Sequence, residues 1–545
     1  MDRTLLYGVV FLYALAVAGL GYYAYCRTKN DKDYLIAGGN VHPVLMALAY
    51  GSTFISTAAI VGFGGTAAMF GMGLLWLTVA NIFVGIFLAF VFFGKRTLVV
   101  GRNLDAKTFP ELLGRRYNSS FIQKYTAAVI AVAMPLYAAA VMIGGSRFLE
   151  QTLNINYQAA VWVFALFVAS YVLIGGLKGV IYTDALQGGI MFVGMVTLLI
   201  LTYAKLGGPL AAHESLTQLA SQVPAALAQK GHQGWTQMPV FLSEYWWVVV
   251  STLVLGVGIG VLAQPQLVVR YLTVKSPREL NRAVGIGGVF ILAMTGVAFA
   301  VGALTNVYFS QTVGQISLLA AADPVTKTPN MDRIIPLYIN MAMPQWFAYL
   351  FMLTLLSAAM STLSGQFHVI GTSLSRDLYA GSRKGSAAQS LMINRLGLVV
   401  ALGISVWLSF KLPLNIIAVA TAIFFGVCAA SFLPAYVAAL YWPRATKAGA
   451  LASMLVGSIT SLFLLTFVFA RGSASLGISQ AIFNKPALFA FPWTVIDPIV
   501  IALPLSAVTM IAVSLLTEPV EQSLLRRCLL SRIASPAGTA SAKEV

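Results

Sequence analysis

The chain has 545 residues, of which 59% are hydrophobic and only 9% are charged. Charged residues make up roughly 25% of an average soluble protein, so this composition excludes a water-soluble globular protein. The formal net charge is +17, yet no basic cluster is interleaved with aromatic residues, and we expect no nucleic-acid partner. The three cysteines and four histidines are scattered and match no metal-ligand spacing.

Apolar segments of the length that a membrane-crossing helix needs recur along the whole chain. They are long and uniformly apolar, whereas the strands of a transmembrane barrel are short and alternate. We therefore predict an all-α polytopic membrane protein with about 13 transmembrane helices and an uncleaved first helix. The predicted spans are residues 4–26, 43–72, 74–94, 123–146, 157–175, 182–204, 244–273, 283–308, 346–376, 393–410, 412–440, 446–470 and 495–516.

The distribution of basic residues predicts the orientation. With these spans, 25 of the 34 Lys and Arg residues, Arg270 among them, fall on one side and 9 on the other. Because positively charged loops are retained in the cytoplasm, the N-terminus is expected outside and the C-terminus inside. Residues Asp332 to Ala342 are expected to form a short helix over the outer mouth, and Thr108 to Arg116 an interfacial amphipathic helix inside. No P-loop pattern is present, so ATP-driven transport is not expected.

Two predicted spans are interrupted near their middle. The second contains GSTFISTAAIVGFGG (Gly51 to Gly65), and the seventh contains LGVGIGVLAQP (Leu255 to Pro265). A broken helix frees backbone carbonyls, which survive in a membrane only where protein encloses them. The two breaks lie five helices apart, as expected for a five-plus-five inverted repeat. Alternatively, the glycines only permit close helix packing.

The chemistry available in the spans favours a metal cation over a proton as the coupling ion. Asp184, Asp377 and Asp497 are expected near membrane edges, and no carboxylate is a clear candidate for a deep proton carrier. Carbonyls of an unwound helix and neutral hydroxyls suffice for sodium. Ser361 and Thr362 lie one turn after Ala358 on one helix face, although such hydroxyls often bond back to their own helix.

Four motifs together resemble the sodium:solute symporter family. They are ISTAAIVGFGG, GGLKGVIYTDALQGG (Gly175 to Gly189), MSTLSGQFHVIGTSLSRDLY and YWPRATKAGALASMLVG (Tyr441 to Gly457). The second places Lys178 and Asp184 in a glycine-rich link between two apolar segments, where charge is expensive and therefore usually functional. The resemblance extends from the first helix to about residue 515.

The resemblance implies the leucine-transporter-type 5+5 inverted-repeat fold with one extra N-terminal and two extra C-terminal helices. The implied parts are an extra helix and cytoplasmic link (1–42), the first repeat of five helices (43–204), an outer loop (205–243), the second repeat (244–440), two C-terminal helices (441–516) and a cytoplasmic tail (517–545). It also implies a Na⁺ site. Its ligands would be the carbonyls of Ser52, Ile55 and Ala358 and the hydroxyls of Ser361 and Thr362. Asp184 would act electrostatically along the sodium exit path, or serve as a structural ion pair or helix cap.

The solute is expected between the broken helices, beside the ion. Candidate contacts are Thr53, Phe54, Thr57, Tyr137, Gly258 and Gln264. Half-helix N-termini suit a carboxylate. Relative to the proline-transporting branch, Phe54 stands where an aspartate is usual and Ala58 where a tryptophan is usual, which argues against proline and against a sugar-type site. The chain looks most similar to the sodium/pantothenate branch in three runs: IGGSRFLE (Ile143 to Glu150), QP (Gln264 and Pro265) followed by VVRYLTVK, and ALYWPRATKAGA.

We therefore predict a sodium-coupled symporter for a small, carboxylate-bearing or neutral polar solute, in the plasma membrane of a prokaryote. It is not expected to be an enzyme or to need an obligatory protein partner. The alternatives are proton coupling, a proline or other amino-acid substrate, and a membrane sensor that does not transport.

Overall fold

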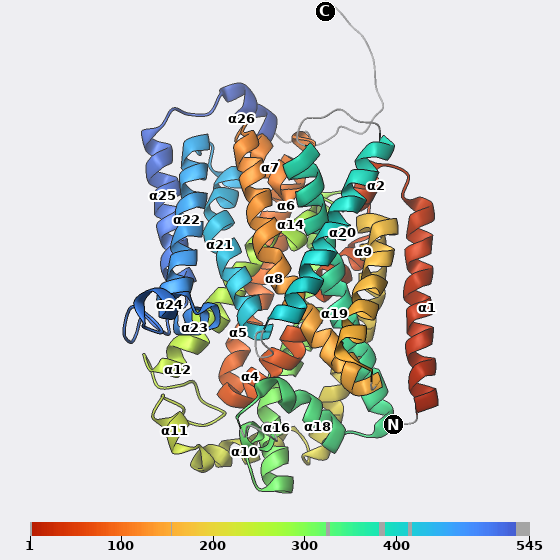
Figure 1. The fold of residues 1–545 in the computed structure, drawn as a ribbon, viewed down its shortest axis with the longest axis vertical. Coiled ribbons are helices and arrows are strands. Elements are labelled where there is room, and N and C mark those ends of the chain that lie inside the picture. Colours follow the sequence, from red (N-terminus) through yellow and green to blue (C-terminus); the bar gives the residue numbers. More distant parts are fainter. Residues whose placement is uncertain (1–2, 154, 323–327, 381–386, 413–416, 530–545) are drawn as a thin grey trace, which may run out of the picture.

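The computed structural model describes residues 3–153, 155–322, 328–380, 387–412 and 417–529. Within these residues every regular element is helical, and the β pairing is limited to an isolated bridge between Val41 and Val274. The start of α1 and the helix α26 lie at opposite ends of the molecule (Figure 1).

The long helices and the shorter segments that continue them lie mostly along the long axis of the molecule (Figure 1). In chain order they are α1 (Arg3–Arg27), α3 (Pro43–Phe54), η2 (Ala58–Gly62), α4 (Phe63–Phe70), α5 (Leu75–Ile82), η4 (Phe83–Gly94), α6 (Lys95–Asn103), α8 (Ser120–Leu153), α9 (Tyr157–Lys205), α12 (Glu244–Trp247), η6 (Val248–Val257), α13 (Gly258–Gly260), η7 (Val261–Ala263), α14 (Pro265–Tyr271), α15 (Pro277–Ile291), η8 (Leu292–Gly296), α16 (Val297–Val313), α19 (Gln345–Thr372), η10 (Ser373–Ala380), α20 (Ala387–Lys411), α21 (Ile417–Tyr441), α22 (Lys447–Phe467) and α25 (Ile499–Leu516).

Shorter helices lie in the connections. They are α2 (Asp31–Ile36), η1 (Ala37–Gly39), η3 (Gly71–Leu74), α7 (Phe109–Arg116), α10 (Pro209–Gln218), η5 (Leu219–Gln222), α11 (Ala225–Ala228), α17 (Ser317–Ala320), η9 (Met331–Arg333), α18 (Ile334–Ala342), α23 (Ala470–Leu476), α24 (Ile478–Phe483) and α26 (Gln522–Leu529).

The all-α membrane class is confirmed, while the count of 13 helices stays a prediction. In the described ranges, 11 helices are long and apolar enough to cross a membrane. Two of them, Ala58–Asn103 and Tyr157–Lys205, have 46 and 49 residues, whereas a single crossing needs only about 20.

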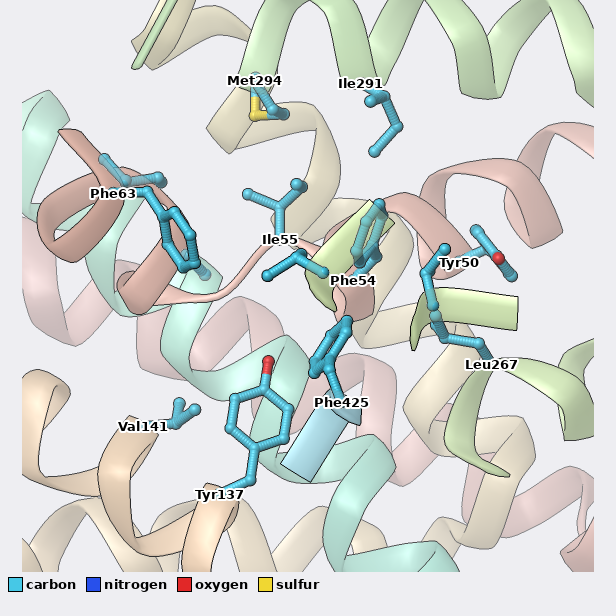
Figure 2. Close-up of a cluster of buried hydrophobic side chains, with 14 of the residues drawn as sticks. Tyr50, Phe54, Ile55, Phe63, Tyr137, Val141, Leu267, Ile291, Met294 and Phe425 are labelled. Carbon is cyan, nitrogen blue, oxygen red and sulfur yellow. The ribbon is translucent and has the colours of Figure 1, made fainter. Parts of the chain in front are cut away.

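Both predicted interruptions are present. Helix α3 ends at Phe54, and Ile55 is extended (φ −93°, ψ 101°) before the chain turns helical again. Figure 2 shows this non-helical link, with the side chains of Phe54 and Ile55 projecting from it. In the second break, Gln264 has φ −72° and ψ 113°, and α14 then begins with Pro265. Proline suits this first position because its missing N–H would have no helical partner there.

Helix α9 bends sharply at Gly176, inside the glycine-rich motif. Gly176 has φ 56° and ψ −152°, a conformation open essentially only to glycine. A Cβ atom there would lie 2.5 Å from the ring of Tyr34. Nearby, Lys178 pairs with Asp33 through an Nζ–Oδ1 contact of 2.8 Å. Lys178 thus ties α9 to the connection after α1, and its partner is not Asp184.

The segment from Thr108 to Arg116 was expected to be an interfacial helix, but it forms the largely buried helix α7 (Phe109–Arg116). Thr108 caps this helix through the amide of Glu111, and most of its residues are buried. The guanidinium of Arg116 donates to the carbonyls of Ala439 (3.0 Å) and Trp442 (3.2 Å). These carbonyls lie at the C-terminal end of α21, where they lack helical hydrogen-bond partners. Arg116 is therefore buried because it caps the end of another helix.

The connection after α9 is attached to the end of α4. The indole of Trp235 is buried, its Nε1 donates to the carbonyl of Ala68 (2.8 Å), and its own carbonyl accepts from the amide of Met72 (2.7 Å). Gly71, with φ 72°, permits this approach. The short helix predicted from Asp332 to Ala342 is confirmed as η9 and α18.

Replacing Gly176 by alanine should destabilise the protein by about 1–3 kcal/mol, because alanine is strained in this conformation and would contact Tyr34. Gly189→Ala, on the same helix with open space around the added Cβ, is the matched control and should be neutral. The apparent melting temperature of purified protein measures both. Equal melting temperatures for the two variants would contradict the conclusion that the kink at position 176 requires glycine.

Candidate functional site

The broken helix α3 and helix α19 meet through hydroxyl and carbonyl oxygens. The Ser361 hydroxyl donates to the Ser52 carbonyl at 2.9 Å and lies 3.3 Å from the Ala358 carbonyl. The Thr362 hydroxyl donates to the carbonyl of Thr53 at 3.1 Å. All of these side chains are buried. Of the two contacts of the Ser361 hydroxyl, the shorter one is to α3. The hydroxyl therefore does not bond only to a carbonyl of its own helix.

Three of the five predicted sodium ligands, Ser52, Ala358 and Ser361, are therefore joined directly by these contacts. The fourth, Thr362, reaches α3 through the neighbouring carbonyl of Thr53. The fifth, Ile55, is the extended residue of the break itself, where a carbonyl is released from the helical ladder. All five offered atoms are neutral oxygens, which suit a hard monovalent cation. The role of the set as ion ligands stays a prediction.

A buried ion pair lies directly beside these oxygens. Oδ2 of Asp184 is 2.8 Å from Nη2 of Arg270, and both side chains are 0% exposed. The Thr53 hydroxyl donates to Oδ2 of Asp184 at 2.9 Å and also contacts the Arg270 guanidinium. The Ser364 hydroxyl donates to Oδ1 at 2.9 Å. The carboxylate is thus held by four elements: α3, α9, α14 and α19.

This pair corrects one expectation. Asp184 forms a buried ion pair, which was one of the roles expected for it. Arg270, counted among the loop cations, instead belongs to α14, and its side chain is buried. Each is stable there because the other supplies the opposite charge, which a buried ion requires. The available signal was that Arg270 lies within the predicted span 244–273, where an arginine needs a partner.

A glycine makes room for the guanidinium. A Cβ atom at Gly365 of α19 would lie 3.2 Å from Nη2 of Arg270 and 3.0 Å from Cγ2 of Thr53. Arg270 reaches Asp184 only through Nη2, since its Nε and Nη1 are buried without a partner among the described residues. The charge of Asp184 is therefore neutralised through one nitrogen of Arg270, and a small shift between α14 and α9 would break this ion pair.

A small, partly open pocket lies next to the break, and Figure 2 shows the side chains of Phe54, Ile55 and Tyr137 that line it. Phe54 and Tyr137, both predicted solute contacts, line it, and the Tyr137 and Phe425 rings meet edge to face at 5.8 Å. The lining residues are Phe54, Ile55, Ser56, Ala59, Phe63, Leu77, Asn81, Tyr137, Val257, Thr295, Phe299, Thr421 and Phe425. Ile55 thus belongs to both the break and this pocket, which we call the central pocket.

The other four predicted solute contacts lie outside the lining of the central pocket. The Thr53 hydroxyl is engaged by Asp184, and the Thr57 hydroxyl is buried without a partner in the described part of the chain. Gly258 packs toward Ala80. Gln264 donates to the carbonyl of Gly260 at 3.2 Å. Their role as solute contacts stays a prediction.

Sequence reasoning did not find the polar residues that the central pocket does contain. Asn81 lines it, and its Oδ1 is buried without a partner in the described structure. Asn81 lies in a uniformly apolar predicted span, and an unpaired amide inside such a span was the signal that could have revealed it.

Comparison with known proteins decides the family. Residues 34–457 match the family described as the sodium:solute symporter family. The chain belongs to the sodium:solute symporter family. This symporter is 29% identical over 467 residues to the sodium/pantothenate symporter of Haemophilus influenzae, covering 84% of this chain and 89% of that one. It is 28% identical to the high-affinity proline transporter PutP of Bacillus subtilis, covering 81% and 88%.

A solved structure shows the same fold. The substrate-bound, outward-open structure of a Na⁺-coupled sialic acid symporter aligns with a TM-score of 0.74 and 19% identity, covering 95% of this symporter and 98% of that chain. The predicted fold class is thereby confirmed. Sodium as the coupling ion is confirmed by the family, and the relatives are named as transporters, as expected for a protein that is not an enzyme. The pantothenate and proline relatives match almost equally well, so the comparisons leave the substrate open.

Asp184→Asn or Arg270→Gln alone should lower stability by about 3–5 kcal/mol, because each leaves an uncompensated buried charge. The double variant should recover much of this loss, since no charge then remains. Apparent melting temperatures of the four proteins give the coupling. Lys178→Gln, which breaks a pair with side chains 15% exposed, is the control and should cost less. Additive single losses would contradict direct pairing.

Proposed function

We propose that this symporter imports a small polar solute bearing a carboxylate, such as pantothenate or a monocarboxylate, together with Na⁺ by alternating access. The observation that carries the proposal is the extended residue Ile55. It separates α3 from η2, and it lies between the oxygens shared with α19 and the central pocket.

Sodium would bind among the carbonyls of Ser52, Ile55 and Ala358 and the hydroxyls of Ser361 and Thr362. These oxygens come from two elements, α3 and α19, so the ion would hold the elements together. The Ser52–Ser361 and Thr53–Thr362 contacts support this placement because they already bring the two elements within bonding distance. Entry of one positive charge is driven by ~2.3 kcal/mol per 100 mV of membrane potential.

The solute would lie in the central pocket. The pocket combines aromatic walls with the amide of Asn81 and the hydroxyls of Tyr137 and Thr295. The half-helix that begins after Ile55 has the partial positive charge of its N-terminus near this region, which favours a carboxylate. Ser56 accepts from its first amides, at Ala58, Ala59 and Ile60, so the attraction would be electrostatic. Fixing the conformation of Ile55 by sodium would shape the pocket wall, and this coupling requires no covalent chemistry.

Release would proceed toward the cytoplasm. With the N-terminus outside, Asp184, which follows the kink of α9 at Gly176, and Arg270 of α14 would lie toward the cytoplasmic side. Sodium would leave first along this path. Asp184 is engaged by Arg270, so a departing ion meets a neutralised carboxylate and is not trapped. A proline or other amino-acid substrate is the second candidate, favoured by the proline transporters among the relatives.

Uptake into proteoliposomes tests this function. An inward sodium gradient should drive accumulation of labelled pantothenate, and a parallel assay with labelled proline tests the second candidate. Accumulation of either solute driven by a proton gradient without sodium would contradict sodium coupling. A protein that binds solute but accumulates none would point to a sensor.

Ser361→Ala should raise the sodium concentration needed for half-maximal uptake by at least about tenfold, because the ion loses a ligand. Ser405→Ala is the matched control. Its hydroxyl is equally buried but bonds to the Ala401 carbonyl of its own helix at 2.9 Å, so its sodium dependence should stay unchanged. Equal sodium dependence of the two variants would remove Ser361 from the ion site.

Asn81→Ala should raise the KM for the solute by roughly tenfold while leaving the sodium dependence unchanged, because a buried amide contact is worth about 1–2 kcal/mol. Initial uptake rates at saturating sodium measure this. An unchanged KM would place the solute away from the central pocket.

A further inference from the structure

A second, partly open pocket is lined by residues of α21 other than those that line the central pocket. We call it the lateral pocket. Its lining residues are Thr252, Leu253, Ile423, Gly426, Ser461, Leu465, Phe469, Arg471, Asp497 and Pro498. They come from η6, α21, α22, α23 and the start of α25. Most of the wall is apolar, but two opposite charges, Arg471 and Asp497, belong to it.

The carboxylate of Asp497 lies deep in the lateral pocket without a direct ionic partner. Asp497 is 5% exposed, and none of the ion pairs formed within the described residues includes it. Its Oδ1 accepts from the amide of Ile499 at 3.0 Å. The Thr252 side chain and the more distant charge of Arg471 also act on this carboxylate. Without a direct ion pair, burial of the carboxylate stays costly, and a positive group that approached it closely would lower that cost.

Small and polar residues leave room around this carboxylate. A Cβ atom at Gly426 would lie 3.6 Å from Oδ1 of Asp497, and one at Gly256 would lie 3.9 Å from Oδ2. The Ser461 hydroxyl, which also lines the pocket, is 1% exposed and has no hydrogen-bond partner in the described part of the chain. A buried hydroxyl left unpaired in a pocket indicates a missing polar ligand.

The positively charged side chain of Arg471 lies at the opening of the lateral pocket. Arg471, in the first turn of α23, is exposed yet lines the pocket together with Phe469. Its guanidinium can bind a carboxylate from the solvent side. The side chains of Leu253, Ile423 and Leu465 give the lateral pocket an aliphatic lining beside these two charges.

We propose that the lateral pocket is a second solute site that binds a small zwitterion with an aliphatic body. Its ammonium group binds Asp497 and the Ser461 hydroxyl, and its carboxylate binds Arg471. One ligand thereby neutralises both charges, which neither a simple cation nor a simple anion can do. An occupant would press on α21, whose neighbouring residues Thr421 and Phe425 line the central pocket.

Equilibrium binding to the purified full-length protein tests the proposal with three probes of one carbon skeleton. L-leucine carries both charges, 4-methylpentanoate lacks the amine, and 3-methylbutylamine lacks the carboxylate. We expect saturable binding of leucine, with each single-charge analogue weaker by at least about tenfold. Absence of saturable leucine binding, or an analogue that binds as tightly as leucine, would overturn the proposal.

Variants locate the binding. Asp497→Asn retains an oxygen for the Ile499 amide and should lower leucine affinity by at least about tenfold, as should Arg471→Gln. The exposed position of Arg471 keeps the test valid if Asp497→Asn does not fold. Asn81→Ala, in the central pocket, should leave leucine affinity within about twofold. The opposite pattern, with loss in Asn81→Ala only, would assign the binding to the central pocket. Since binding and not uptake is measured, failure of this proposal leaves sodium-coupled transport untouched.

Discussion

The salt bridge between Asp184 and Arg270 is the contact on which the arrangement of the site depends. It joins the second broken helix, through α14, to α9, while Thr53 and Ser364 bring α3 and α19 to the same carboxylate. A buried charge pair tolerates little displacement, because separation leaves two uncompensated ions in a low-dielectric interior. The pair therefore holds both breaks in one fixed relation.

The sodium and solute sites follow from this relation. Since Thr53 is held by Asp184, the carbonyls of Ser52 and Thr53 face the hydroxyls of Ser361 and Thr362. The chain then leaves the helix at Ile55, whose side chain forms part of the central pocket. One short extended segment thus connects an oxygen cluster with a solute pocket, and a change at either place is transmitted through two or three residues of backbone.

The sequence alone predicted those features that depend on residues close together in the chain. Glycines and Pro265 predicted both helix breaks, and the spacing of Ala358, Ser361 and Thr362 placed them on one face. Contacts that depend on tertiary geometry were missed. Asp184 and Arg270 lie 86 positions apart in the sequence. Basic residues near the end of a span are ordinarily loop charges, so Arg270 was counted as a cytoplasmic loop residue and not as a buried one. Helix α7 has an amphipathic pattern, but most of its residues are buried and its Arg116 contacts the end of α21.

The central claim is that sodium bridges the unwound residues after α3 to α19. Hydrogen–deuterium exchange of the purified protein in sodium chloride, compared with potassium chloride of equal ionic strength, tests it most directly. The account predicts slower exchange in peptides covering residues 51–58 and 358–362 in sodium, with peptides of α22 unchanged. Identical exchange of residues 51–58 in the two salts would contradict it.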